Sequence, residues 1–203
     1  RTYLGDPRPD QAVKAIPGQG SHVPITLLGS SLFSAQLAAQ LGMPFAFAAH
    51  FAPQYLYAAA ELYHEQFRPG VLARPHMMVG VAVIAAESDT AARRLFTTPQ
   101  QRFLRLIRNQ PVELLSPVDS MDGIWTEWER AVVESKLGAA IVGSNATVKR
   151  GLEKLVRDTG ASELIVVTDT YTHEDRLESY RRVAEIATTV EAGERAPAAW
   201  QTN

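Results

Sequence analysis

The sequence lacks cysteine, long apolar runs and any strong excess of charge. Without cysteine among its 203 residues, disulfide bonds and thiolate chemistry are excluded. No apolar run approaches the roughly 20 residues of a membrane span, and the first residues lack the pattern of a signal peptide. The formal net charge of -2 offers no basic surface for nucleic acid or an anionic membrane. We therefore expect a cytoplasmic protein without nucleic-acid or membrane partners.

Metal-ligand patterns are also missing. His22, His64, His76 and His173 show no spacing such as two histidines on one helical face with a nearby carboxylate. We therefore expect no bound metal.

The composition, with 46% hydrophobic and 21% charged residues, is that of a globular chain with one sizeable core. The first residue is Arg1, and residues 1–20 are rich in glycine, proline and charge. We interpret them as a connecting segment entered from the middle of something larger. Residues 21–188 form the ordered domain, and residues 189–203 are expected to be a disordered tail.

Strand and helix patterns alternate along this domain. Apolar runs predict strands at residues 25–28, 44–49, 77–86 and 163–168. Helical sequence is expected at about residues 32–42, 53–67, 91–108, 125–137, 147–158 and 172–188. This order is typical of a parallel sheet built from βαβ units. Four such units match half of a (β/α)₈ barrel, which has about 250 residues, or a small open doubly wound sheet. Composition does not choose between them.

The segment 109–123 is too long for an ordinary connection and contains two prolines. Loops of this kind in α/β enzymes are often lids. Trp125 and Trp128 follow it. They could cover an apolar substrate or, as aromatic residues more often do, pack into the core.

The stretch from Pro24 to Gly42 organises the rest of the chain. It predicts a buried strand, a turn of small residues and a helix. A helix that begins at the carboxyl end of a parallel strand presents free N–H groups and the positive end of its dipole to an anion. Ser31 and Ser34 could add hydroxyl donors. Alternatively, Ser31 is only the N-cap of the helix, with Ser34 sharing its first turn.

A resemblance favours the anion site. The run from Leu28 to Pro53 contains Gly-Ser-Ser-x-x-Ser-Ala followed by His-Phe-Ala-Pro. It closely resembles the second half of the bacterial luciferase-like flavin-dependent monooxygenases. The likeness covers about residues 20–188 and continues through residues 77–81, 95–97, 117–122, 141–144 and 159–164.

The resemblance implies a TIM (β/α)₈ barrel of the luciferase-like type, with only about the last four βα units present. It also implies an oxidoreductase that uses reduced FMN, supplied by a separate reductase, and O₂ to oxygenate a small organic substrate. The match begins near the fifth strand of the family, so the contacts made by the first four strands have no counterpart in this chain.

The resemblance also implies site residues. The expected contacts to the FMN phosphate are Gly29, Ser30, Ser31, Ser34 and the amide of Ala35, with Leu32 and Phe33 lining the entrance. Contacts to the isoalloxazine ring are expected from Ala48, Ala49 and Phe51.

His50 follows the second predicted strand, on the face where a barrel places its active site. Its imidazole could bind flavin or substrate or transfer a proton. Alternatively, it caps the next helix or bonds a neighbouring carbonyl. Asp169 follows the last strand and is expected on the same face.

A second function remains open at this stage. The chain could be a flavin-binding or structural half-barrel without turnover that pairs with another chain. An incomplete barrel exposes two sheet edges, and exposed edges invite pairing with another copy. We therefore expect a homo-oligomer.

Overall fold

The computed structural model describes residues 3–190 and shows an α/β fold with a parallel sheet. Of the tail expected at 189–203, residues 191–203 lie outside the described residues. The strands in the described part are β1 (Leu27–Gly29), β2 (Phe45–Ala48), β3 (Met77–Ala86), β4 (Ile141–Ser144) and β5 (Glu163–Val167). The helices are α1 (Leu32–Gln40), the short 3₁₀ helix η1 (Pro53–Tyr55), α2 (Leu56–Glu65), α3 (Asp89–Ile107), α4 (Glu127–Lys136), α5 (Asn145–Thr159) and α6 (His173–Ala187).

The sheet is organised around β3, its longest strand. β1 pairs with β2, β2 with β3, and β3 with β5, all in parallel. The last four residues of β3 extend further and pair with β4 instead. Within residues 3–190, β1 and β5 each pair with a single strand, so the sheet is open and not closed into a barrel.

The expectation of four strand–helix units is wrong by one. The third predicted strand coincides with β3, but β4 was not predicted. This strand has four residues and ends in Gly143 and Ser144, and Ser144 is also the N-cap of α5. Its partners are residues Val83 to Ala86 of β3, more than fifty positions earlier. A strand that depends on such distant pairing carries little local signal.

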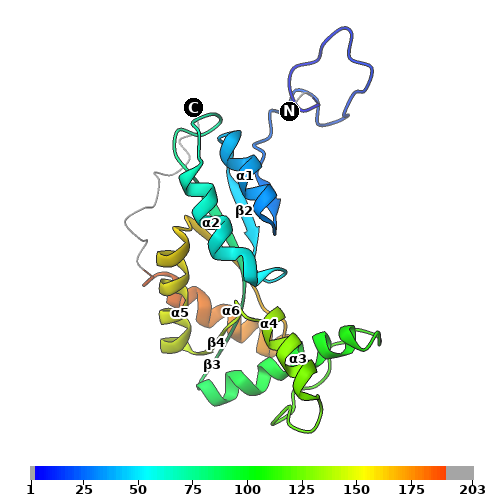
Figure 1. The fold of residues 1–203 in the computed structure, drawn as a ribbon, viewed down its shortest axis with the longest axis vertical. Helices are drawn as coiled ribbons and strands as arrows, with labels where there is room; N and C mark the ends of the chain where they lie inside the picture. Colours follow the sequence, from blue (N-terminus) through cyan, green and yellow to red (C-terminus); the bar gives the residue numbers. More distant parts are fainter. Residues whose placement is uncertain (1–2, 191–203) are drawn as a thin grey trace.

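One face of the sheet is covered by helices. Alternate residues of β3, namely Met77, Val79, Val81 and Val83, are fully buried. They share a hydrophobic core with side chains of β2 and of α1, α2, α5 and α6. Along this face α1 contacts α2, α2 contacts α5, and α5 contacts α6. This layer of helices fixes the strands from one side (Figure 1).

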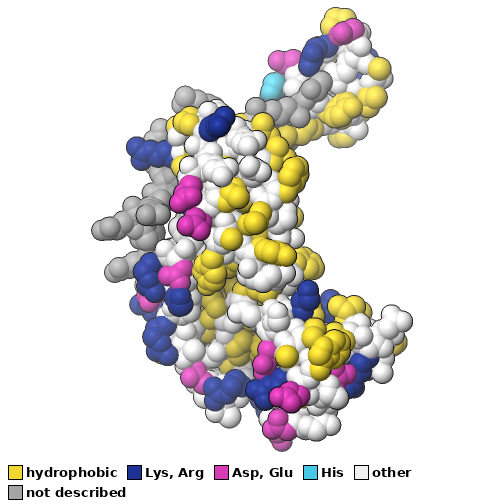
Figure 2. Space-filling view, viewed as in Figure 1, with side chains coloured by type: hydrophobic (Ala, Val, Ile, Leu, Met, Phe, Trp, Pro, Cys, Tyr) yellow, Lys and Arg dark blue, Asp and Glu magenta, His cyan; other side chains and the backbone are white. Residues whose placement is uncertain are grey.

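The opposite face of the sheet is open. Leu28 of β1 is 72% exposed and Ile165 of β5 is 49% exposed, although both are large apolar side chains in strands. Figure 2 shows that the molecule is curved around a hollowed edge along which hydrophobic side chains gather. A parallel sheet is normally covered on both faces, so this face is the surface on which a further layer would pack.

The carboxyl-terminal end of β3 carries a separate lobe. In it, α3 and α4 pack together around Leu104, Met121 and Val133 (Figure 1). At the other end of the molecule, residues 3–26 contain no helix or strand and project from the sheet. Among residues 3–190, no helix is both long and apolar enough to cross a membrane.

Candidate active site

Two turns that follow neighbouring strands lie at one edge of the sheet. Because β1 and β2 run parallel and pair directly, their carboxyl ends meet at the same edge. The serine turn, residues 29–35, follows β1 and enters α1, and the histidine turn, residues 49–52, follows β2. The residues expected to hold a cofactor are thus carried by adjacent loops.

Reciprocal hydrogen bonds between Ser31 and Ser34 close the serine turn. The Ser34 amide donates to Oγ of Ser31 at 3.3 Å, and the Ser31 amide donates to Oγ of Ser34 at 3.4 Å. The Ser34 hydroxyl also donates to the Ser31 carbonyl oxygen at 2.7 Å. This arrangement is a capping box. The interpretation of Ser31 as an N-cap is therefore confirmed.

The cap leaves donors available for a ligand. Among residues 3–190, no acceptor bonds the amides of Leu32 and Phe33, the first two residues of α1. Both side chains are exposed, so the amides lie near solvent at the positive end of the helix. The amide of Ala35 instead donates to the Ser31 carbonyl oxygen at 3.4 Å, and Ala35 is fully buried. The turn can therefore receive a phosphate while its cap stays intact.

Gly29 makes this tight turn possible. A Cβ atom at Gly29 would lie 2.1 Å from Oγ of Ser34, far inside van der Waals contact. A side chain at this position would force the hydroxyl away from the turn. Glycine therefore lets the end of β1 approach the first turn of α1 closely.

His50 is held against β3. Its backbone amide donates to the Gly80 carbonyl oxygen at 3.2 Å, and its ring atom Nδ1 lies 3.3 Å from the same oxygen. Because a carbonyl oxygen only accepts, Nδ1 carries the proton in this contact, and Nε2 of a neutral ring remains an acceptor. A Cβ atom at Gly80 would lie 3.1 Å from the ring, so glycine gives the imidazole its room. The prediction that His50 bonds a neighbouring carbonyl is therefore confirmed, and the carbonyl is that of Gly80.

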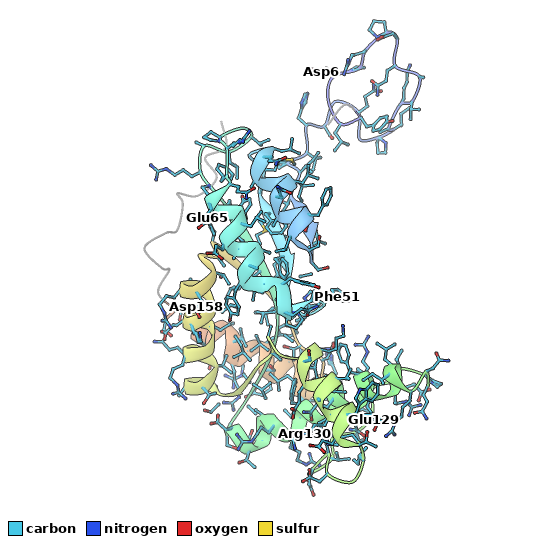
Figure 3. All side chains as sticks on the ribbon, viewed as in Figure 1. Asp6, Phe51, Glu65, Glu129, Arg130 and Asp158 are labelled. Carbon is cyan, nitrogen blue, oxygen red and sulfur yellow. The ribbon has the colours of Figure 1, made fainter. Side chains whose placement is uncertain are left out.

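His50 borders a cavity of about 390 Å³, the histidine cavity. It lies on the open face of the sheet between β3, β5 and the α3–α4 lobe. Apolar side chains dominate its walls, among them Phe51, Ile84, Phe96, Phe103, Leu106, Val142 and Val167. Phe51 is mostly exposed and stands on the hollowed side of the molecule (Figure 3). The volume lies within the range of about 300–1,000 Å³ typical of small-molecule sites.

The predicted ring contacts Ala48 and Ala49 lie beside this cavity but do not line it. Ala48 pairs with Gly80 at the end of β2. Ala49 is fully buried in the main core. Likewise, none of residues 29–35 lines the histidine cavity. The structure therefore brings Phe51 and His50 together with Asp169, and it leaves the serine turn further along the same edge.

The polar end of the histidine cavity is an ion pair. Nη1 of Arg102, on α3, lies 3.0 Å from Oδ2 of Asp169, which follows β5. The side chains are 43% and 52% exposed. Sequence reasoning missed Arg102. A signal was available, because Phe96, Phe103 and Leu106 share a helical face with it, and an arginine beside an apolar stripe marks a possible polar contact.

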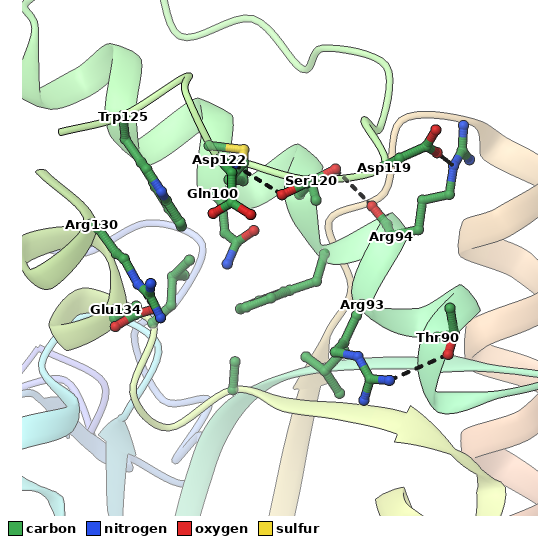
Figure 4. Close-up of a pocket in the computed structure, with 16 residues that line it drawn as sticks. Thr90, Arg93, Arg94, Gln100, Asp119, Ser120, Asp122, Trp125, Arg130 and Glu134 are labelled. Carbon is green, nitrogen blue, oxygen red and sulfur yellow. Dashed lines mark hydrogen bonds and ion pairs between the residues drawn. The ribbon is translucent and has the colours of Figure 1, made fainter. Parts of the chain in front are cut away.

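A second, outer cavity of about 940 Å³ lies on the other side of α3 (Figure 4). Its rim is charged: Arg94 pairs with Asp119 at 2.9 Å, and Arg130 pairs with Glu134 at 2.8 Å. The two cavities share four lining residues: Phe96, Leu137, Ala140 and Val142. These four side chains are therefore a common wall between the outer cavity and the histidine cavity.

The segment 109–123 contains no helix or strand and is fastened to α3. The Thr98 hydroxyl donates to the Leu115 carbonyl oxygen at 2.8 Å. The side-chain amide of Gln101 donates to the Ser116 carbonyl oxygen at 3.0 Å. Thr98 and Gln101 are buried. Val112 of this segment lines the histidine cavity, so the segment forms part of its wall. Trp125 packs in the α3–α4 core and precedes α4, whereas Trp128 on α4 is exposed.

A clamp joins the two ends of this segment. Both carboxylate oxygens of Glu129 accept from the Arg108 guanidinium, at 2.7 and 2.9 Å, and Oε2 also accepts from the Thr126 amide at 2.7 Å. The bonds from Arg108, followed by the one from Thr126, lower the pKa of Glu129 to about 2. The clamp holds the start of α4 against the end of α3 and so fixes the wall between the cavities.

Asp89 provides a similar connection at the base of the lobe. Its carboxylate accepts from the Ser144 amide at 2.7 Å and from the Thr147 hydroxyl at 3.1 Å. The bonds from Ser144, followed by the one from Thr147, lower the pKa of Asp89 to about 2. The first turn of α3 is thereby tied to the first turn of α5.

Comparisons with known proteins agree with this architecture. Residues 2–185 match the family described as luciferase-like monooxygenase. An uncharacterized protein of Bacillus subtilis, YvbT, is 49% identical over 175 residues, which cover 86% of this chain and 52% of that protein. A luciferase-like monooxygenase of Escherichia coli K12 is 43% identical over 182 residues, which cover 89% and 54%. The chain thus spans about half the length of the curated relatives it matches.

A solved structure shows the same fold. The crystal structure of apo-MsnO8 superposes with a TM-score of 0.72 at 30% sequence identity. The match covers 95% of this chain and 58% of that protein.

Proposed function

Because the chain belongs to the luciferase-like monooxygenase family, we propose that it contributes to an FMN-dependent monooxygenase that oxygenates a small organic substrate with reduced flavin and O₂. One observation carries this proposal. The serine turn, with its unbonded helix amides, and His50, with its cavity, lie at the same carboxyl edge of parallel neighbouring strands. In parallel α/β folds this edge is where ligands bind.

The serine turn fits the phosphate of FMN. The unbonded amides of Leu32 and Phe33 supply N–H donors, and Ser30 and Ser31 directly precede them in the turn. The positive end of the α1 dipole adds to the attraction for a dianion. Gly29 keeps the backbone close enough for this contact. These groups would anchor the cofactor by its phosphate.

His50 is the proposed proton-handling residue of the site. With Nδ1 bonded to the Gly80 carbonyl oxygen, Nε2 is available to accept a proton from a ligand or return it. The apolar walls of the histidine cavity limit the access of water to a bound substrate. When bound, reduced FMN would supply the electrons and react with O₂, and the chain would position the substrate. A separate reductase is the proposed source of reduced flavin.

A flavin titration of this 203-residue chain tests the proposal. We expect FMN to bind more tightly than riboflavin, which lacks the phosphate, with flavin fluorescence as the measurement. Ser34→Ala removes the hydroxyl that orders Ser31, so we expect it to weaken FMN binding by roughly tenfold while riboflavin binding changes little. Ser88→Ala is the control, because it removes the N-cap hydroxyl of another helix, α3, away from the serine turn.

Two results would count against this function. Equal affinities for FMN and riboflavin would refute the assignment of the serine turn as a phosphate site. Equal losses of FMN affinity in Ser34→Ala and Ser88→Ala would show that the effect is a general loss of a helix cap.

A second candidate function has its own observation in favour. The open face of the sheet exposes Leu28 and Ile165, so the chain can serve as a flavin-binding or structural half-barrel that pairs with another chain. Pairing with a second copy would cover this face and the unpaired edges of β1 and β5. We accordingly propose self-association of the chain.

A further inference from the structure

The polar end of the histidine cavity consists of one cation and one anion. Its lining contains one guanidinium, that of Arg102, and one carboxylate, that of Asp169, and the two are paired at 3.0 Å. The charges of Arg102 and Asp169 cancel. The remaining walls are mostly hydrocarbon.

This pair has unused bonding capacity on both partners. Among residues 3–190, the Arg102 guanidinium donates only through Nη1, and Oδ1 of Asp169 accepts no hydrogen bond. The N–H groups on Nε and Nη2 of Arg102 can therefore donate hydrogen bonds to a ligand. Oδ1 of Asp169, in the same ion pair, can accept one. The pair presents a donor and an acceptor side by side at the end of an apolar cavity.

These features select among three kinds of end group on an apolar ligand. A carboxylate would accept from Arg102 but would meet the negative charge of Asp169. A pure hydrocarbon would take water from the pair and leave its free donors and acceptor unbonded, which costs free energy. An uncharged group with both an acceptor and a donor bonds both partners without adding charge.

We propose that the histidine cavity takes a largely apolar, uncharged molecule whose polar end carries both an acceptor and a donor, such as a primary amide or a hydroxyl, and that Arg102 and Asp169 are its specificity-determining residues. This inference rests on the proposed function only in assigning the bound molecule as the substrate. The recognition itself needs no flavin.

The test compares octanamide with octanoate, which have the same length and shape and differ in charge near pH 7. Binding to the 203-residue chain is measured by isothermal titration calorimetry, with no flavin present. We expect octanamide to bind at least about tenfold more tightly than octanoate, the factor that corresponds to roughly one good hydrogen bond. Equal affinities, or tighter binding of octanoate, would overturn the proposal.

Two variants change this preference in opposite directions. Asp169→Asn leaves the Arg102 cation without its partner, so we expect octanoate to become the tighter ligand. Arg102→Met keeps an unbranched, flexible stem but removes the donors, so we expect octanamide to lose about tenfold in affinity and octanoate to lose more. Arg93→Met is the matched control, because Arg93 lies on the same helix but does not line this cavity. Unchanged preferences in both cavity variants would overturn the proposal, and the wild-type comparison decides it if either variant fails to fold.

The flavin titration separates this inference from the proposed function. Selective amide binding without FMN binding would support the cavity assignment and remove the monooxygenase proposal. FMN binding without amide selectivity would support the monooxygenase proposal and refute the cavity assignment.

Discussion

The hydroxyl of Tyr63 ties together the starts of the two strands that carry the histidine site. It donates to the Met43 carbonyl oxygen at 2.8 Å, ahead of β2, and accepts from the His76 amide at 3.1 Å, ahead of β3. The Tyr63 side chain is fully buried on α2. Tyr63→Phe would remove only this oxygen and, with it, the hydrogen bonds to the Met43 carbonyl and from the His76 amide.

The expected cost follows from those two bonds. Loss of a hydrogen bond to a buried polar group costs about 1–3 kcal/mol, so the loss of both bonds predicts a decrease of about 3 kcal/mol in the free energy of unfolding. For a chain of this size, this corresponds to a decrease in Tm of roughly 6–12 °C. Urea unfolding and a thermal melt of wild type and variant measure both quantities.

Tyr57→Phe is the matched control, because Tyr57 lies on the same helix but is largely exposed. We expect this change to alter the free energy of unfolding by less than about 0.5 kcal/mol. If Tyr63→Phe proved as harmless as Tyr57→Phe, the hydroxyl would not bridge the two strands as described.

Alkaline pH gives an independent check. Burial raises the pKa of Tyr63 to about 12, against a lowering effect of the hydrogen bond from His76. A folded-state pKa above the unfolded value of 10.0 means that the neutral form stabilises the fold below pH 10. That stabilisation is lost as the pH rises from 10 towards 12. Tyr63→Phe should lack this component, so a pH dependence identical to that of wild type would contradict the assignment.

Two further changes probe the lobe and the open face. Glu129→Gln should lower stability at pH 7 by weakening the contact to Arg108, and it should flatten the acid dependence, because the folded-state pKa of Glu129 is about 2 against an ordinary value of 4.5. The stabilisation by the wild-type clamp is present above pH 4.5 and lost as the pH falls towards 2. Unfolding of both proteins is measured across that range. An equal dependence of the free energy of unfolding on pH in the two proteins would refute the clamp. Ile165→Glu places a charge on the open face and should shift analytical ultracentrifugation profiles from dimer to monomer, while Tyr57→Glu on the covered side should not. A wild-type chain that is monomeric at all concentrations would rule out self-association.

Local patterns predicted the elements that are defined by their own residues. β3 is a ten-residue apolar run whose alternate side chains are fully buried, and its predicted bounds are those of the structure. The N-cap at Ser31 and the stop at Gly42, which has a φ of 57°, follow from side-chain and backbone chemistry within one turn. Such signals depend on neighbours along the chain.

Features that depend on distant partners were missed. β4 forms because the end of β3 offers it unpaired backbone groups, and those partners lie far away in the sequence. Arg102 reaches the histidine cavity because Asp169, beyond β5, holds its guanidinium. Asp169 was expected on the correct face because it directly follows a strand. Arg102 lies inside a long helix, where its place beside an apolar stripe indicated a polar contact but not its partner, so the contact with Asp169 could be recognised only in three dimensions.

The ten-residue length of β3 lets it carry two different parts of the chain. Its first residues pair with β2, which in turn pairs with β1 ahead of the serine turn, whereas its last residues pair with β4 beside the α3–α4 lobe. Substitutions in the lobe would alter which molecules enter the histidine cavity without disturbing the turn beside β1. A protein engineer could therefore exchange residues 90–140 while retaining Asp89, which ties α3 to α5, and so obtain new selectivity beside a constant serine turn.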